Sequence, residues 1–205
     1  TTLLKDYPGV RFDPEGEQRE QREFGQSLQM GFGIALLMIY VLLAIPLQSY
    51  TQPLMVMIVI PFSIIGALGG HMIMGIDLSI SSIMGLLALI GVVVNDSLVL
   101  VDFTNKRIKE GMPIIKAIRF AGGARFRPIL LTSLTTFAGL TPLILEKSTQ
   151  AQFLIPMAVS LGFGILFATF LTLFLIPSLY LILEDIKNIF RAIIAGFVKL
   201  TSVFG

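Results

Sequence analysis

The sequence predicts an all-α membrane protein, built as a bundle of five membrane-spanning helices with an additional helix on the cytoplasmic surface. The chain is 55% hydrophobic and only 14% charged, and its mean hydropathy is +0.86. Apolar stretches of about 18 or more residues are typical of membrane spans. These stretches are almost continuously apolar, whereas strands of a membrane barrel alternate. The spans are therefore predicted to be helices, in which the backbone groups form their hydrogen bonds within the segment.

The membrane region is predicted to cover residues 24–185, in order along the chain. The five predicted spans are 24–46, 53–75, 79–104, 128–145 and 153–183. Before them, residues 1–23 are polar and predict the end of a domain outside the membrane. After them, residues 186–205 predict an amphipathic cytoplasmic tail, because apolar residues recur there at helical spacing.

The orientation follows from one strongly basic connection. Residues 105–127 contain seven Lys or Arg against a single acid, Glu110. Loops with such an excess are cytoplasmic, so the N-terminus is predicted outside and the C-terminus inside. Apolar residues recur at helical spacing within 106–124, which predicts an amphipathic helix lying on the inner surface. A solvated basic loop is the alternative interpretation of that segment.

The first residues indicate that more chain precedes them. The sequence begins Thr-Thr, and residues 1–23 lack the basic start and apolar core of a signal peptide. A polar N-terminus placed outside needs an earlier span or a signal to cross the membrane. We therefore expect this chain to be the C-terminal part of a longer membrane protein.

The candidate functional residue is Asp96, in the middle of the third predicted span. No Lys or Arg occurs from Leu28 to Asn105, and the acids of that stretch are Asp77, Asp96 and Asp102. A carboxylate near the centre of a bilayer costs about 2.5–3.5 kcal/mol, so such groups usually serve proton or ion movement. The alternative is a structural carboxyl that is hydrogen-bonded to a neighbouring helix.

Polar residues near Asp96 extend the candidate site. At about 1.5 Å per residue, Asp96 lies about 25 Å from the outer end of its span and about 13 Å from the inner end. Asn95 and Asp102 share a face that is turned by about 100° from Asp96. Thr132 and Thr136 share a face of the fourth predicted span and bracket the predicted depth of Asp96. Their hydroxyls either serve the carboxylate or bond to their own helix.

The sequence gives less support to a metal site, a cofactor or a protease. The chain has no Cys and one His, His71, so no metal site and no cofactor are expected. A lone His near the end of a span is more often a hydrogen-bonded interface residue than a proton carrier.

A non-transporting assembly subunit stays open as an alternative. An intramembrane protease is disfavoured, since it needs two facing acids or a serine with a paired His or Lys.

Four segments together resemble the resistance-nodulation-division (RND) transporters. GVVVNDSLVLVDF (91–103) resembles their tenth transmembrane helix, and RFRPILLTS (125–133) resembles the start of the eleventh. PFSIIGAL (61–68) is similar to the ninth, and YPGVRFD (7–13) is similar to the segment that leaves the second periplasmic loop. The resemblance runs in order over 7–185. It implies that this chain supplies spans eight to twelve of a twelve-helix transmembrane domain.

The resemblance also implies function, partners and location. It implies efflux of drugs or other amphipathic compounds, driven by inward proton flow, from a homotrimer in the bacterial inner membrane. The expected partners are the N-terminal half of the same transporter, the bilayer, a periplasmic adaptor and an outer-membrane channel, with no nucleic acid. A relative that translocates proteins or exports lipids is the alternative within the superfamily.

The site residues carry over from the resemblance position by position. The implied proton relay contains Asp96, Asn95 and Thr132, and Arg125 matches a basic residue near the cytoplasmic mouth of the proton path. Thr136 and Asp102 are possible supports by the spacing above. The common drug pumps have Lys where this chain has Asn95 and Asn where it has Asp96. The relay implied here therefore lacks the cation of the tenth span.

Overall fold

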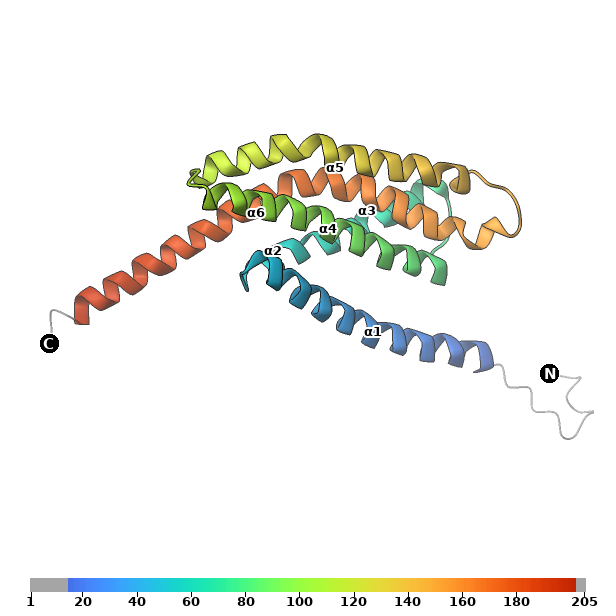
Figure 1. Ribbon diagram of the computed structural model, residues 1–205. Helices are drawn as coiled ribbons and strands as arrows, with labels where there is room; N and C mark the ends of the chain where they lie inside the picture. Colours follow the sequence, from blue (N-terminus) through green and yellow to red (C-terminus); the bar gives the residue numbers. More distant parts are fainter. Residues whose placement is uncertain (1–14, 202–205) are drawn as a thin grey trace, which may run out of the picture. The chain divides into compact units, whose positions relative to one another are not determined.

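The computed structural model describes residues 15–201, and its backbone is helical over most of that range (Figure 1). The chain divides into two compact units, Thr1–Leu42 and Leu43–Gly205, which are described separately. The predicted extracytoplasmic segment 1–23 lies partly outside the described residues, and from Glu15 onward it belongs to a helix. The elements in order are α1 (Glu15–Leu47), α2 (Gln52–Met57), α3 (Val59–Met74), α4 (Ile80–Lys109), α5 (Ile114–Ile144), the short 3-10 helix η2 (Ala151–Phe153) and α6 (Ile155–Thr201).

The described part of the chain is all-α, as predicted, and contains four helical stretches that are long and apolar enough to cross a membrane. They are Ser27–Leu47, Gln52–Met74, Ile80–Lys109 and Ile155–Lys187. The predicted span 128–145 is not among them. It forms the second half of α5, where four threonines and Ser133 lower the hydropathy of an otherwise apolar helix.

Local sequence sets the helix boundaries. Ser79 caps α4: its hydroxyl accepts from the backbone N–H of Ser82, and the Ser82 hydroxyl accepts from the backbone N–H of Ser79. This reciprocal capping box satisfies two otherwise unpaired donors. Gly75 ends α3 in the left-handed region, with a φ of 64°. Glycine adopts that conformation without steric cost, so α3 stops there and the chain turns toward α4.

The basic connection folds differently from the prediction. The expected surface helix 106–124 is divided, because its first four residues complete α4 and residues from Ile114 onward begin α5. Gly111, with a φ of 90°, and Pro113 separate the two helices. No break follows at Pro128, so α5 passes directly from its basic half into its apolar half. The predicted tail 186–205 is likewise not a separate helix, because α6 continues without a break through Thr201.

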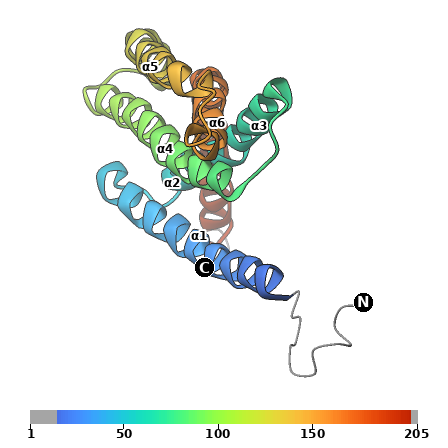
Figure 2. The same ribbon diagram turned by 90° about the vertical axis from the view of Figure 1, so that its right-hand side faces the viewer.

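Within the second unit, α6 lies at the centre and packs against α3, α4 and α5 (Figure 2). Glycines permit this close approach. A Cβ on Gly66 or Gly70 of α3 would overlap the Phe167 or Phe163 side chain of α6. A Cβ on Gly164 of α6 would likewise overlap the Leu89 side chain of α4. The GxxxG spacing of α3 therefore serves helix packing, as small residues do in membrane bundles.

Candidate functional site

Asp96 lies on the flank of α4, between its buried face and its exposed face. The buried face is formed by residues that recur every three or four positions, among them Leu89, Val93, Ser97 and Leu100. Asn95 lies on the opposite side and is exposed, whereas Asp96 is half-buried. Within residues 15–201, Asp96 makes no hydrogen bond or ion pair to another side chain.

The flank that carries Asp96 faces α5. Phe103 follows Asp96 by seven residues, which places both side chains on one side of α4. The Phe103 ring stacks on Phe120 of α5, with centroids 6.2 Å apart and an angle of 12° between the planes. The guanidinium of Arg125, also on α5, lies over the same ring at 4.6 Å. These contacts fix how α4 and α5 are aligned.

Asp96 and Thr132 lie on the same side of the Phe103–Arg125 contact, each seven residues away from it along its own helix. α4 and α5 are antiparallel neighbours (Figure 1). Thr132 follows Arg125 by seven residues, just as Asp96 precedes Phe103 by seven. Two turns along each helix from the Phe103–Arg125 contact therefore lead to Asp96 on one helix and Thr132 on the other.

The threonine hydroxyls bond to their own helix. Thr132 Oγ1 donates to the carbonyl of Pro128 at 2.9 Å, and Thr136 Oγ1 donates to the carbonyl of Thr132 at 2.8 Å. The structure thus contains the simpler of the two arrangements considered for these residues. A hydroxyl that donates in this way keeps lone pairs that accept a hydrogen bond. Thr132 is exposed on this chain and Thr136 is half-buried.

Two further predicted residues lie toward the basic end of the bundle, which we define as the end where α4 stops at Lys109 and α5 starts at Ile114. Asp102 forms an ion pair with Lys106, with 2.7 Å between Oδ2 and Nζ. Arg125 is held by its stacking on Phe103, and its buried Nε has no hydrogen-bond partner within the described residues.

The structure also contains polar contacts that the sequence analysis did not predict. Ser133, next to Thr132, faces inward and shares a 2.5 Å hydrogen bond with Thr169 of α6. His71 bonds through Nε2 to Ser82 Oγ at 2.9 Å and through Nδ1 to the Ala67 carbonyl at 3.0 Å. This arrangement agrees with the interpretation of His71 as a hydrogen-bonded interface residue.

A second inter-helix network joins three helices at the basic end. Asn105 Nδ2 donates to Gln52 Oε1 at 2.8 Å, and Gln52 Nε2 donates back to Asn105 Oδ1 at 3.1 Å. Tyr180 Oη also donates to Asn105 Oδ1, at 2.7 Å. The sequence signal for this network was limited to two polar side chains at the ends of apolar stretches, far apart in the chain.

Comparison with known proteins then identifies the chain. The profile of the AcrB/AcrD/AcrF family matches residues 3–184. The chain belongs to the AcrB/AcrD/AcrF family of RND transporters. Among solved structures, the membrane part of a heavy metal efflux pump superposes with a TM-score of 0.75 at 28% identity, covering 86% of this chain and 18% of that one.

Several members of this family are similar in sequence. The swarming motility protein SwrC of Bacillus subtilis is 31% identical over 185 residues, which is 89% of this chain and 18% of that protein. MdtC of Erwinia amylovora, a multidrug resistance protein, is 31% identical over 75% of this chain and 15% of its own length. CzcA of Cupriavidus metallidurans, a cobalt-zinc-cadmium resistance protein, is 35% identical over 75% of this chain and 14% of its own length. The chain therefore spans less than a fifth of these relatives.

Proposed function

We propose that this chain is the C-terminal membrane part of a proton-driven RND transporter that exports amphipathic compounds, and that Asp96 is its proton-carrying group. The observation that carries the proposal is the position of Asp96. It is a half-buried carboxylate in the apolar helix α4, on the flank that faces α5. An ionisable group at such a depth is costly, and proteins use such groups in proton relays.

Protonation of Asp96 supplies the energy for a change in helix packing. Neutralising the carboxylate removes a cost of about 2.5–3.5 kcal/mol for an ion in the bilayer centre. At about 1.4 kcal/mol per factor of ten, a cost of that size shifts an equilibrium between two helix arrangements by about 100-fold. Thr132, two turns from the Phe103–Arg125 contact on α5, accepts a hydrogen bond from the protonated carboxyl. Arg125, two turns closer to the basic end, attracts the ionised form toward that end.

The exposed face of α4 supports a larger relay. Asn95 on this face is exposed, and Asp102, seven residues further along the same face, is half-buried. A polar face of this kind is costly against lipid. We propose that the N-terminal half of the same transporter covers it and contributes the remaining relay groups. Thr136 and Asp102 then support the relay without carrying the proton themselves. Asp102 is already paired with Lys106.

The proposed setting follows the family and the charge pattern. The transporter is a homotrimer in the bacterial inner membrane, working with a periplasmic adaptor and an outer-membrane channel. The basic end of the bundle faces the cytoplasm, because a connection with seven basic residues and one acid stays inside. The N-terminus of this chain is then periplasmic and its C-terminus cytoplasmic.

Export of an amphipathic dye tests the proposal. The complete transporter, as the cell makes it, is expressed in cells that lack other efflux pumps, and dye efflux is followed after energisation. Asp96→Asn is expected to reduce efflux to the level of cells without the transporter, at unchanged membrane abundance. Asp77→Asn, an exposed carboxylate outside the helices, is the matched control and is expected to keep full efflux. Normal efflux by Asp96→Asn would instead favour a non-transporting role.

Divalent transition metals are the second candidate cargo. CzcA is 35% identical to this chain, and the structure with a TM-score of 0.75 is that of a heavy metal efflux pump. The same cells, challenged separately with an amphipathic dye and with cobalt, zinc or cadmium salts, distinguish the two cargo classes. Protection against the metals alone would replace the amphipathic cargo and leave the proposed role of Asp96 unchanged.

A further inference from the structure

A cavity of about 280 Å³ opens at the basic end of the second unit. Its lining includes Leu47, Gln52, Lys109 and Lys187. Leu47 ends α1, Gln52 begins α2 and Lys109 ends α4. Lys187 follows the apolar part of α6, shortly after its first charged residues, Glu184 and Asp185. The cavity therefore lies at the level where the apolar helices meet water, which is the level of lipid headgroups.

The floor of the cavity is fixed before any ligand arrives. Gln52 and Asn105 line the cavity and exchange two hydrogen bonds, and Tyr180 donates a third to Asn105. Gln52 is only 7% exposed, so its amide is held in place by burial as well as by bonding. Because these residues come from α2, α4 and α6, the network holds three helix ends in one arrangement. A preorganised floor lowers the ordering cost of binding.

The charge of the cavity is positive. Lys109 and Lys187 line it, and none of the residues that line it is acidic. Lys109 Nζ donates to the neutral Gln48 Oε1 at 3.0 Å. The acid near Lys187 is Glu184, with 3.8 Å between Nζ and Oε2, which is too long for a hydrogen bond. Both ammonium groups therefore keep N–H donors for a further partner.

Gln48 is held in an unusual backbone conformation beside these lysines. Its φ is 50°, in the left-handed region that glycine prefers. For a residue with a Cβ this conformation costs about 1 kcal/mol or more, and such positions cluster at ligand sites. The glutamine side chain supplies what glycine lacks, namely the amide oxygen that positions Lys109 at the rim of the cavity.

We propose that this cavity binds the phosphate group of an anion at the membrane boundary, with an anionic phospholipid headgroup as the favoured source. Lys109, Lys187 and Ser49 all line the cavity. Basic pockets between transmembrane helices at the cytoplasmic boundary bind such headgroups. At about 30 Å³ per water, the cavity has room for about nine waters. That space fits a phosphate with its glycerol.

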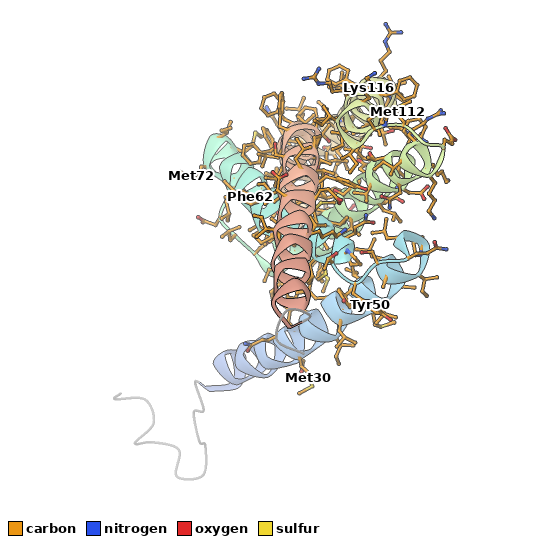
Figure 3. All side chains as sticks on the ribbon, turned by 90° about the vertical axis from the view of Figure 1, so that its left-hand side faces the viewer. Met30, Tyr50, Phe62, Met72, Met112 and Lys116 are labelled. Carbon is orange, nitrogen blue, oxygen red and sulfur yellow. The ribbon has the colours of Figure 1, made fainter. Side chains whose placement is uncertain are left out.

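Native mass spectrometry of the complete transporter, purified in detergent, tests the proposal. The probes are phosphatidylglycerol, zwitterionic phosphatidylcholine and inorganic phosphate. The variant is Lys109→Gln with Lys187→Gln, and the charge-keeping partner is Lys109→Arg with Lys187→Arg. The matched control is Lys116→Gln with Lys147→Gln, which removes the same charge from exposed sites away from the cavity; Lys116 is labelled in Figure 3.

The proposal predicts that only the loss of the two cavity lysines weakens lipid binding. Removing both cavity lysines weakens phosphatidylglycerol binding by about 30-fold, at about 1 kcal/mol per lysine near the surface. The control pair and the arginine pair retain binding, and phosphatidylcholine binds weakly to all variants. Competition by inorganic phosphate would identify a soluble phosphate as the ligand, and absence of competition identifies the lipid.

Equal phosphatidylglycerol binding by wild type and the Lys109→Gln, Lys187→Gln variant, with no phosphate effect in either, would overturn the proposal. So would an equal loss in the control pair, which would show only a general charge effect. Circular dichroism and gel filtration check folding, and the single variant Lys187→Gln decides the matter if the double variant fails to fold. Asp96→Asn should leave lipid binding unchanged, so failure of the proton relay is distinguishable from failure of this site.

Discussion

The guanidinium carbon of Arg125 lies 4.6 Å from the centre of the Phe103 ring, and this contact joins the basic half of α5 to α4. Arg107 lies over the same ring at 5.0 Å and over Phe120, also at 5.0 Å. Two cations thus share an aromatic pair at the basic end. Asp96 and Thr132 each lie two turns from this contact on their own helix, so the cluster sets the relative position of the helix segments that carry them.

Phe103→Ala should therefore disturb both stability and export. Loss of the ring removes the aromatic stack and two cation–π contacts, each worth about 0.5–2 kcal/mol. We expect a lower temperature of unfolding in detergent and slower dye efflux at equal abundance. Phe126→Ala, at a ring that is 48% exposed, is the control. Equal effects of both changes would show that the cluster has no special part in aligning the helices.

Gly70 and Gly69 form a matched pair for testing helix packing. A Cβ on Gly70 would overlap the Cβ of Phe163, whereas a Cβ on Gly69 meets nothing within 4 Å. Gly70→Ala should lower the free energy of unfolding by about 1–3 kcal/mol, the usual cost of overpacking. Gly69→Ala should be neutral or slightly stabilising, because alanine is the better helix former. Unfolding in mixed micelles measures both, and equal stabilities would contradict the close packing of α3 on α6.

The network at the basic end predicts a graded loss of stability. Tyr180→Phe removes one donor while Asn105 keeps its two bonds to Gln52. The expected cost is about 0.5–1.5 kcal/mol. Asn105→Leu leaves both Gln52 and Tyr180 without this partner, and buried unpaired groups cost about 1–3 kcal/mol each. Ser178→Ala, at an exposed hydroxyl that bonds its own helix, should be neutral. The reverse order of effects would contradict the network.

The sequence predicted the helices well where apolar length alone decides them. The four apolar stretches of the described residues each coincide with a predicted span. The break between α2 and α3 at Ile58 does have a sequence signal, because Pro61 cannot donate to the carbonyl of Met57, four residues earlier. The continuity of α5 through Pro128 was missed. Pro128 has no N–H for the carbonyl of Ala124, four residues earlier. A helix in a membrane bundle continues through a proline when other groups satisfy the carbonyl that is left free.

The candidate site was predictable only in part. Asp96 stands out because a charge in an apolar helix is rare. The turn of about 100° per residue also predicted that Asn95 and Asp96 lie on different faces of α4, and Asn95 is exposed whereas Asp96 is half-buried. The inward position of Ser133 could not be predicted from the sequence, because it depends on which side of α5 meets α6. Ser133 bonds Thr169 across that interface, and the two are 36 residues apart.

The connection between α5 and α6 predicts one effect of pH. Backbone N–H groups of Ser148 and Lys147 donate to the Glu146 carboxylate and lower its pKa below the ordinary value. A lowered pKa means that the turn is stabilised above the unfolded value of about 4.3 and loses that contribution as pH falls through the folded pKa. The amide shift of Ser148 should therefore titrate below about pH 4.3. Glu146→Gln should abolish this titration, and an inflection at higher pH would contradict the assignment.

Proton release into proteoliposomes tests the central role of Asp96 most directly. The complete transporter is reconstituted with a pH-sensitive dye inside the vesicles, and cargo is added under an imposed proton gradient. The account predicts that wild type and Asp77→Asn couple cargo movement to proton flux, whereas Asp96→Asn moves neither although it is folded and inserted. Cargo-dependent proton flux through Asp96→Asn at the wild-type rate would contradict the account.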